Sequence, residues 1–239
     1  MNQEEIWINH IKHLTPSDVV NEYNNPAVFQ KEFCNLIDSY AGTNKRIIEV
    51  GCETGVTSFL LSEKFDKSLL DLNPNAIAIA LAEASASLLN KKANFYVGDM
   101  FKMEFQDETF DLVFNAGVIE HFIKEDRTLA LREYARILKN GGAMIIAFPN
   151  HHCPPYRFAY LLLRLIGRWP YPTEYKLYNL IEEIKKAGLV LNSRQTLSRG
   201  TIFNWLGFAF PIKKLFLFFD RFFKYEGYLT VLVITKENS

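Results

Sequence analysis

The sequence has few cysteines, no net charge and no long apolar run. Its three cysteines, Cys34, Cys52 and Cys153, are scattered without paired metal-ligand spacing, which favours a reducing compartment over a disulfide scaffold. Lysine plus arginine and aspartate plus glutamate both number 27, so no global field attracts nucleic acid. No stretch reaches the roughly 18 apolar residues of a spanning helix, and the acidic N-terminal segment lacks a signal-peptide core. We therefore expect a cytoplasmic protein that neither crosses a membrane nor binds nucleic acid.

Short apolar segments alternate with helical patterns from Arg46 onward, which is typical of a parallel sheet covered on both faces. The sequence predicts a single α/β domain over 1–239, with a doubly wound, mostly parallel seven-stranded sheet and an antiparallel last strand. We expect 1–45 to form a helical flank, and 149–175 and 197–227 to form lid-like insertions over the cleft. The predicted strands are 46–50, 69–72, 94–97, 110–115, 143–148, 189–196 and 228–236.

The segment RIIEVGCETG at 46–55 is an apolar strand that ends in a turn bounded by Gly51 and Gly55. A turn at the carboxyl end of the first strand of such a sheet is where these folds bind nucleotides. The dinucleotide pattern G-x-G-x-x-G is missing, and Glu49 and Glu53 would repel a pyrophosphate. The two acids suit a ligand with an amine and a sulfonium instead.

These residues resemble the class I S-adenosylmethionine-dependent methyltransferases, in particular the small-molecule (methyltransferase type 11) group that includes quinone-pathway O-methyltransferases. The resemblance covers about residues 40–239: E-V-G-C-E-T-G resembles the family's glycine-rich loop, Asp71 its ribose-binding acid and Asp99 its adenine-contacting acid. The fourth-strand motif resembles FNAGVIEHF at 114–122. The resemblance implies S-adenosylmethionine as cofactor, with these cofactor-binding residues: Glu49, Gly51, Cys52, Glu53, Gly55, Asp71, Leu72, Asp99, Met100, Asn115, Ala116 and Gly117.

Glu53 departs from the family pattern, which usually has glycine at this position. If the residue adopts φ > 0, its side chain costs on the order of 1 kcal/mol. Glu53 therefore predicts either a right-handed turn or a small strain that is tolerated for function.

His121 follows the fourth strand and is the candidate catalytic residue. It could take a proton from an acceptor hydroxyl as a neutral base, or it could only pack at the start of a helix. Some quinone-pathway relatives have a metal-linked E-x-x-E-H arrangement, but here Gly117 replaces the first Glu, so we predict no required metal. His151, His152 and Cys153 favour a loop beside the cleft over a zinc site.

The predicted reaction is methyl transfer to a small-molecule acceptor, first to a hydroxyl oxygen of an apolar, quinone-like, lipid-linked or sugar substrate. Nitrogen and carbon acceptors stay open. The alternatives are an aminopropyltransferase, a dehydrogenase and a non-catalytic module that binds the cofactor. The sequence does not predict the oligomeric state.

The segment 212–224 plots as a helix with a broad apolar arc, and its basic residues lie mostly on the other side. Basic residues also share one stripe of YRFAYLLLRLIGRW at 156–169. These apolar faces could pack on each other and on the sheet. Alternatively, they could contact a bilayer surface or cover a pocket for a lipid-like acceptor.

Overall fold

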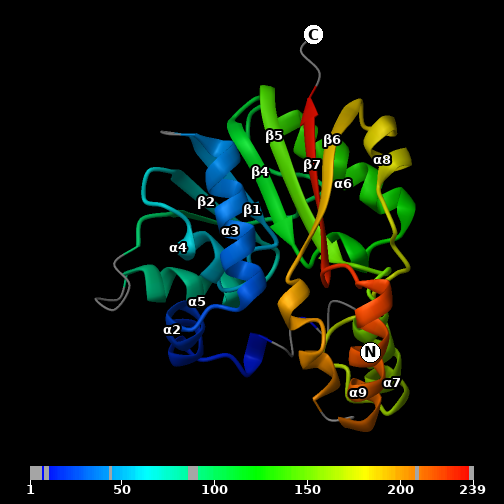
Figure 1. Cartoon of the computed structure of the whole chain (residues 1–239). Coiled ribbons are helices and arrows are strands. Elements are labelled where there is room, and N and C mark those ends of the chain that lie inside the picture. The colour runs from blue at the N-terminus through cyan, green and yellow to red at the C-terminus, as the bar shows by residue number, and fades with distance from the viewer. Residues whose placement is uncertain (1–6, 8–10, 43–44, 86–90, 208–209, 237–239) are drawn as a thin grey trace.

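A seven-stranded sheet forms the centre of the protein, with helices on both faces (Figure 1). The computed structural model describes residue 7 and residues 11–42, 45–85, 91–207 and 210–236. The strands are β1 (Arg46–Val50), β2 (Asp66–Asp71), β3 (Asn94–Val97), β4 (Phe110–Ala116), β5 (Leu138–Pro149), β6 (Leu189–Leu197) and β7 (Leu229–Lys236). The helices are α2 (Pro16–Asn24), α3 (Val28–Ala41), α4 (Val56–Leu60), α5 (Pro74–Ser85), α6 (Lys124–Ile137), α7 (Pro154–Leu165), α8 (Ile181–Lys186) and α9 (Phe210–Phe223), with short 3-10 helices η1 (Ile119–His121), η2 (Arg199–Thr201) and η3 (Asn204–Leu206).

The strand order is β3-β2-β1-β4-β5-β7-β6, and β7 is the strand that runs against its neighbours. The ladder between β5 and β7 extends from Ala143 opposite Thr235 to Pro149 opposite Leu229. This arrangement confirms the predicted mostly parallel, doubly wound sheet with an antiparallel last strand. The first three strands lead outward from β1, and the chain then crosses to β4 on the other side, so the topological switch point lies between β1 and β4.

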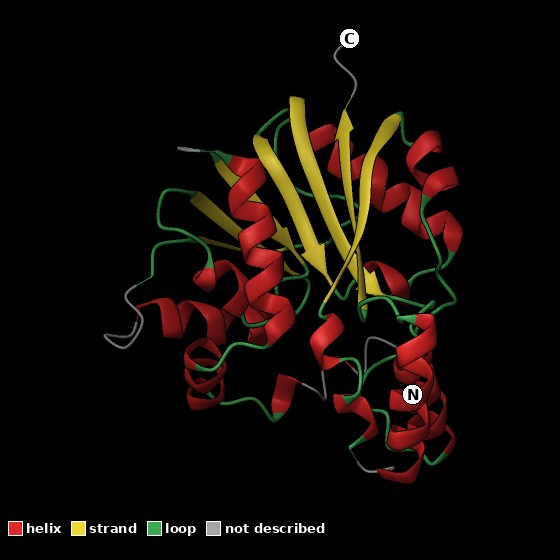
Figure 2. Cartoon of the chain, viewed as in Figure 1, coloured by secondary structure: helices red, strands yellow, loops and turns green. Residues whose placement is uncertain are grey.

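Each face of the sheet is covered because successive strand residues point to opposite sides. On one face, Ile47 and Leu112 pack with Phe33 and Ile37 of α3. On the other face, the adjacent residues, such as Ile48 and Val113, pack with α6 and α8. Figure 2 shows α3 against one face of the central strands. Such strands read as nearly continuous apolar runs because both of their faces are buried.

Local side-chain chemistry fixes where the helices begin. Thr15 and Asp18 form a reciprocal capping box at the start of α2. Asn73 directly before Pro74 predicts a helix cap, and the structure confirms it, because the Asn73 side chain accepts a hydrogen bond from the backbone N–H of Asn75 at 3.0 Å. Pro74 is the first residue of the helix, where a backbone N–H would have no acceptor within the helix, so the missing N–H of proline costs no hydrogen bond. The chain is thereby turned sharply just after the end of β2.

The spacing of Leu177, Leu180, Ile181 and Ile184 predicts a helix over about 174–187, but the helix is much shorter in the structure, where α8 begins at Ile181. The preceding residues have tertiary partners that replace helical hydrogen bonds. The Glu174 carboxylate accepts from Arg157 at 2.9 Å, and the backbone N–H of Tyr175 donates to the Glu120 carbonyl at 2.8 Å. The apolar residues Leu177 and Leu180 are therefore buried by an irregular segment rather than by a helix.

Candidate functional site

A cavity of about 620 Å³ lies where the loops after β1, β2, β3 and β4 meet at the carboxyl edge of the sheet. Its position next to the switch point is the usual ligand position of an open α/β sheet. Its volume is in the range of small-molecule sites. The lining residues are Trp7, Ile11, Gly51, Glu53, Leu70, Asp71, Leu72, Asn73, Pro74, Asn75, Gly98, Asp99, Met100, Phe101, Ala116, Gly117, Val118, His121 and Phe122.

The structure brings together most of the residues that the sequence predicted for the cofactor site. Those that line the cavity are Gly51, Glu53, Asp71, Leu72, Asp99, Met100, Ala116 and Gly117, together with the predicted base His121. Glu49, Cys52, Gly55 and Asn115 are outside the lining set. The four segments that carry the motifs therefore meet at one site, although not every motif residue faces it.

The loop after β1 is tied to the end of β2 through Asp71. One carboxylate oxygen of Asp71 accepts from the backbone N–H of Glu53 at 2.9 Å, and the other accepts from the N–H of Asn73 at 2.8 Å. Glu53 has φ +50°, so the left-handed alternative considered above applies and the side chain stores a small strain. The strained residue directs its N–H to Asp71, which links the two cavity walls.

Two positions of this loop require glycine for steric reasons. At Gly51, with φ +74°, an added Cβ would lie 2.7 Å from a methyl group of Val118. At Gly55, with φ +78°, an added Cβ would overlap a methyl group of Leu69. Gly51 therefore keeps the loop close to the η1 segment across the cavity, whereas Gly55 keeps the start of α4 close to β2.

Glu49 points away from the cavity toward the start of α4. Its carboxyl group accepts hydrogen bonds from the backbone N–H of Ser58, at 3.1 Å, and from the Ser58 hydroxyl. Burial raises the pKa of Glu49 to about 8, so its carboxyl group is mostly protonated at neutral pH. Glu49 therefore caps the first turn of α4, and it does not line the cavity, in contrast to the expectation from the sequence.

Cys52 and Asn115 also serve the surrounding structure. The Cys52 thiol is buried and donates to the Glu53 carbonyl at 3.6 Å. Asn115 is fully buried, and its Nδ2 donates to the Tyr134 hydroxyl of α6 at 3.1 Å. Strand alternation explains the latter, since Asn115 shares the α6 face with Val113, while the next residues, Ala116 and Gly117, line the cavity.

His121 lies in the wall of the cavity at the end of η1. Its Nδ1 is 3.2 Å from the carbonyl oxygen of Thr173, so Nδ1 carries the proton and Nε2 the lone pair in the neutral ring. Burial lowers the pKa of His121 to about 4. The imidazole is therefore neutral at physiological pH, which is the protonation state a base needs, but its basicity is low.

The charge of the cavity is of one sign. Among the described lining residues three are acidic, Glu53, Asp71 and Asp99, and none is lysine or arginine. Burial raises the pKa of Asp71, and the nearby Glu53 carboxylate raises it further. A cationic ligand would relieve this repulsion, whereas a pyrophosphate would meet three acids and no described cationic partner.

The apolar wall of the cavity, which includes Trp7, Ile11, Phe101 and Phe122, was not predicted from the sequence. The Trp7 ring lies edge-on to the His121 ring, with centroids 5.4 Å apart. A signal was present, because Trp7 and Ile11 are four residues apart, a spacing that puts both side chains on one face of a helix. Nothing in the sequence could have placed that segment over the end of β4.

The two predicted insertions lie differently with respect to the cavity. Within 149–175, Thr173 contacts His121 as described, and the Tyr171 ring lies 6.2 Å from the Trp7 ring, at the rim. No residue of 197–227 belongs to the lining set of the described chain. A lid function of either segment stays a prediction.

His151, His152 and Cys153 do not converge on a common point. Both histidine rings pack on Tyr178, and Cys153 is fully buried. Within the described residues, no group of three or more histidine, cysteine, aspartate or glutamate side chains could hold a metal ion. The predicted independence from metal stays a prediction.

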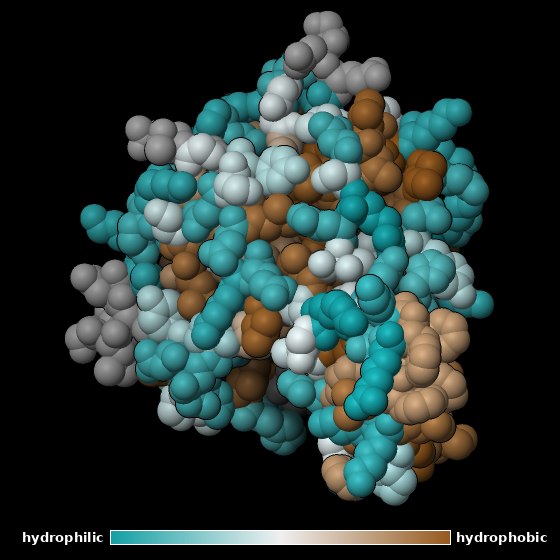
Figure 3. Space-filling model, viewed as in Figure 1, coloured by the Kyte–Doolittle hydropathy of each residue, from teal (hydrophilic) through white to brown (hydrophobic). Residues whose placement is uncertain are grey.

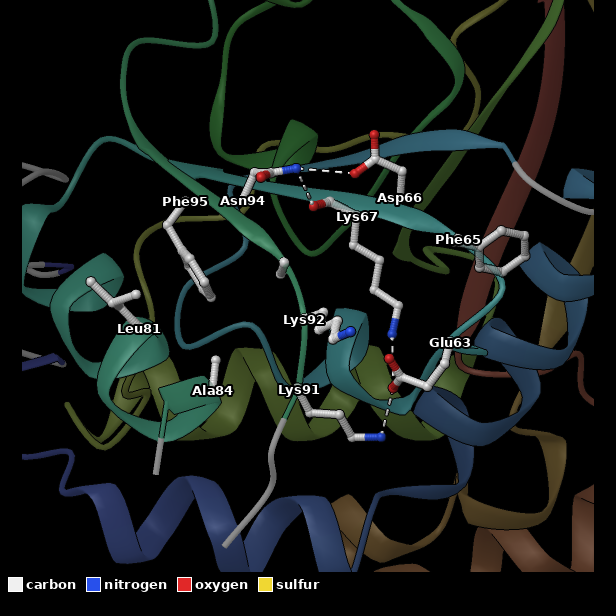
Figure 4. A pocket seen from close by; sticks show the side chains of 11 residues that line it. Glu63, Phe65, Asp66, Lys67, Leu81, Ala84, Lys91, Lys92, Asn94 and Phe95 are labelled. Carbon is white, nitrogen blue, oxygen red and sulfur yellow. Dashed lines mark hydrogen bonds and ion pairs between the residues drawn. The ribbon is translucent and has the colours of Figure 1, made fainter. Parts of the chain in front are cut away.

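A second cavity, of about 750 Å³, lies at the opposite edge of the sheet, beside the first residues of β2 and β3. Figure 4 shows Lys67 and Lys91 directed at one carboxylate, that of Glu63. Asn94 binds Asp66 beside them. Its polar groups therefore largely satisfy one another, and it is remote from the motif residues, so we take the smaller cavity as the functional site.

Residues 48–146 match a protein family described as "Methyltransferase domain". Ajmaline N-methyltransferase of Rauvolfia serpentina is 33% identical over 121 residues, which cover 50% of this chain and 41% of that protein. The chain spans less than half of the length of the curated relatives it matches.

Two solved structures show the likeness of the fold. The putative methyltransferase in complex with the Haloferax volcanii Trm112 methyltransferase activator has a TM-score of 0.67 at 16% identity, covering 92% of this chain and 94% of that one. Geranyl diphosphate methyltransferase in complex with SAM has a TM-score of 0.63 at 13% identity, covering 94% and 90%.

Proposed function

Because the chain belongs to the class I S-adenosylmethionine-dependent methyltransferases, we propose that it transfers a methyl group to a hydroxyl oxygen of a small, largely apolar acceptor. The cofactor is S-adenosylmethionine, which supplies an electrophilic methyl group when bound. The observation that carries the proposal is the acid-lined cavity at the switch point, with His121 in its wall. The protein contributes binding, orientation, exclusion of water and the acceptance of a proton.

The residues present fit this cofactor. Asp71 would bind the ribose hydroxyls, since each of its oxygens accepts one backbone N–H and keeps a further lone pair. Asp99, at the next strand end, would bind the adenine amino group. A Cβ added at Gly117 would meet no atom closer than Oε1 of Glu120, at 3.9 Å, so space beside this backbone is open to a ligand. Glu53 would supply the negative charge that complements a cation.

His121 would accept the acceptor's proton at Nε2. A base with a pKa of about 4 does not ionise an ordinary hydroxyl group beforehand. As the bond from oxygen to the methyl carbon forms, however, the hydroxyl proton becomes strongly acidic, and a weak, correctly placed base suffices. The low pKa of His121 also keeps it unprotonated beside a cationic ligand. We therefore place proton transfer late, together with or after methyl transfer.

The aromatic wall supports an apolar acceptor. Trp7, Phe101 and Phe122 line the cavity near His121, and Tyr171 extends the wall at the rim. Flat rings and aliphatic groups gain most from such surroundings, whereas a sugar needs several directed polar partners. Among the acceptor classes considered, quinone-like or lipid-linked compounds therefore fit better than a free sugar.

A nitrogen acceptor is the second candidate, because ajmaline N-methyltransferase is among the relatives with 33% identity. An unprotonated amine attacks without prior loss of a proton. His121 would then be dispensable for the chemical step, which separates the two candidates experimentally.

The test combines calorimetry with a methyl-transfer screen. S-adenosylmethionine and its demethylated product should bind at one site, and a labelled methyl group should pass to phenolic, quinol or lipid-extract acceptors. The variants His121→Ala and His121→Gln should lower turnover by about 10²- to 10⁴-fold while cofactor affinity stays close to wild type.

The exposed His13→Gln serves as a matched control and should behave as wild type. Unchanged turnover in both His121 variants with a hydroxyl acceptor would refute the role of the base, and preferred labelling of amines would favour the second candidate. Cofactor binding without turnover on any acceptor would indicate a non-catalytic module, and polyamine products formed from the decarboxylated cofactor would indicate an aminopropyltransferase.

A further inference from the structure

Helix α9 turns most of its apolar side away from the protein. None of its residues is buried, although the sequence predicted an apolar arc that could pack against the core. Phe216 fixes one side by packing on Phe158 of α7, with ring centroids 5.7 Å apart. Asp220 fixes the same side by accepting hydrogen bonds from Arg199 and from the N–H of Tyr225. The remaining aromatic residues are left on the outer side.

The exposed rings form one continuous cluster along the helix. Phe222 and Phe223 are 68% and 69% exposed, and Phe218 and Phe219 are 53% and 39% exposed. They touch one another, with centroid distances of 5.4 Å between Phe218 and Phe222 and 6.1 Å between Phe219 and Phe223. Together the four rings expose roughly 450 Å² of surface to solvent, if a fully exposed phenylalanine side chain has about 200 Å². That area from one helix equals the largest apolar patch of many soluble monomers.

Helix α7 extends this surface. Leu161 and Leu165, one helical turn apart, are 59% and 84% exposed. Figure 3 shows apolar side chains gathered over α7 and α9 at the lower right of the molecule. We define the α7/α9 face as Leu161, Leu165, Leu215, Phe218, Phe219, Phe222 and Phe223.

The segments that carry the α7/α9 face are strongly basic, although the chain as a whole has no net charge. Residues 154–168 and 210–224 contain seven basic side chains and one acid, Asp220, so their net charge is +6. Asp220 is paired with Arg199, and Arg157 is paired with Glu174. Lys214, Arg168 and the other described basic residues flank the apolar side chains rather than interrupting them. The remainder of the chain is correspondingly acidic.

We propose that the α7/α9 face docks on an anionic lipid bilayer, with its phenylalanine rings at the boundary between head groups and acyl chains. Large apolar side chains flanked by lysine and arginine are the composition of interfacial helices, and the surface potential of anionic lipids attracts the +6 segments. No described helix is long and apolar enough to cross a membrane, so the contact would lie in the plane of the interface. A protein partner would need acids to match this charge, and a second copy of the same basic face would repel it.

Docking in this way would also bring the cavity toward the membrane. Helix α7 follows directly on β5, and Figure 1 shows α7 and α9 beyond the end of the sheet at which β5 ends. The cavity lies at the same edge. A lipid-linked acceptor could thus approach from the surface on which the protein is docked. This last step depends on the proposed function, but membrane docking itself does not.

The experiment is co-sedimentation of the full chain with phosphatidylcholine vesicles, with and without phosphatidylglycerol, in the absence of cofactor. Wild type should bind the anionic vesicles and release at high salt, and it should bind the neutral vesicles weakly. The double variant Phe218→Glu with Phe222→Glu should lose most binding, at least tenfold in partition coefficient. The double variant Lys214→Glu with Arg221→Glu should weaken anionic binding by roughly fivefold or more for each residue changed.

Matched controls exist on α6 and α8, which pack on a face of the sheet. Leu129→Glu with Ile181→Glu introduces acids at two apolar positions of α6 and α8 that are 51% and 55% exposed. Lys185→Glu with Lys186→Glu reverses two exposed charges of α8. Both controls should bind vesicles like wild type. Because all altered side chains are exposed, melting temperatures should stay close to wild type.

Three outcomes would overturn the proposal. Wild type could fail to bind anionic vesicles, the α7/α9 variants could bind as well as the controls, or the control variants could lose binding equally. Light scattering supplies an independent reading, because a dimeric wild type that becomes monomeric in the Phe218/Phe222 variant would make the face a protein interface. Failure of vesicle binding would leave cofactor binding and methyl transfer untouched, so the two proposals can fail separately.

Discussion

Replacing Asp71 perturbs two properties of the candidate site at once, and the structure separates them. Its carboxylate accepts the backbone N–H groups of Glu53 and Asn73, so it holds the loop after β1 and the turn after β2 in place. Asp71 also lines the cavity, where we propose that it binds ribose hydroxyls. Asp71→Ala removes both functions. Asp71→Asn keeps one oxygen acceptor but loses the charge.

Hydrogen bonds to a charged acceptor contribute about 1.5–3 kcal/mol, so the loss of the ribose contacts in Asp71→Ala should weaken cofactor binding by about 10- to 150-fold. The effect on folding should be smaller, about 1–2 kcal/mol, for two reasons. Water in the cavity can replace the lost acceptor, and the buried carboxylate itself is unfavourable, as its raised pKa indicates. Asp71→Asn should lie between wild type and Asp71→Ala in affinity.

Calorimetry with S-adenosylmethionine and its demethylated product measures the affinity, and urea unfolding measures the stability. Asp66→Ala is a matched control, because Asp66 begins the same strand that Asp71 ends and lies at the opposite edge of the sheet. Wild-type affinity in Asp71→Ala would refute the assignment. An equal loss of affinity in Asp66→Ala would show that the effect is transmitted through the strand rather than through the site.

Two further predictions concern strain and acid stability. Glu53→Gly and Glu108→Gly both relieve positive φ angles, +50° and +56°, and each should raise stability by up to about 1 kcal/mol in urea unfolding. Only Glu53→Gly should also weaken binding of the cationic cofactor, and it should weaken binding of the demethylated product less, because the product has lost the sulfonium charge. The pKa of His121 is about 6.5 in the unfolded chain and about 4 in the folded protein. Between these pH values the unfolded chain binds a proton that the folded protein does not bind. The free energy of unfolding therefore falls as the pH falls from about 6.5 to about 4, by about 3 kcal/mol from this residue. His121→Gln should therefore reduce the acid sensitivity measured by thermal melts from pH 7 to 4, whereas His13→Gln should not; equal slopes in His121→Gln and wild type would contradict the buried neutral histidine.

The sheet could be predicted from the sequence because its signals are local and repeated. The central strands β1, β4 and β5 contain apolar runs bounded by polar or glycine-rich turns, and residues at the carboxyl ends of parallel strands must meet at one edge. That geometric rule predicts that Asp71, Asp99 and Gly117 lie at one edge of the sheet, where the structure places them. The cap at Asn73 was predictable for the same reason, since a cap depends on a few adjacent residues.

Side-chain direction and long-range contacts could not be predicted in this way. Glu49 and Asn115 belong to the right motifs, yet one caps α4 and the other binds Tyr134, and only the packed structure determines which side of a strand end faces the ligand. The contact of Trp7 with His121 joins segments more than a hundred residues apart. The apolar pattern near Leu177 predicted a helix, but Glu174 and Tyr175 gain tertiary hydrogen bonds that a helix would not give them.

The backbone conformation of Glu53, between Gly51 and Gly55, follows from the hydrogen bond that its N–H donates to Asp71. A left-handed residue is required there for its N–H to meet Asp71, and glycine would adopt that conformation more easily. The glutamate adds a carboxylate to a cavity in which Asp71 is already destabilised by burial, so it makes the unliganded site less stable. A cation recovers that energy on binding, and a pyrophosphate would add to the repulsion. On this argument the strain and the charge at Glu53 act together to select the sign of the ligand's charge, a selectivity that comparison of the two glutamate variants can measure.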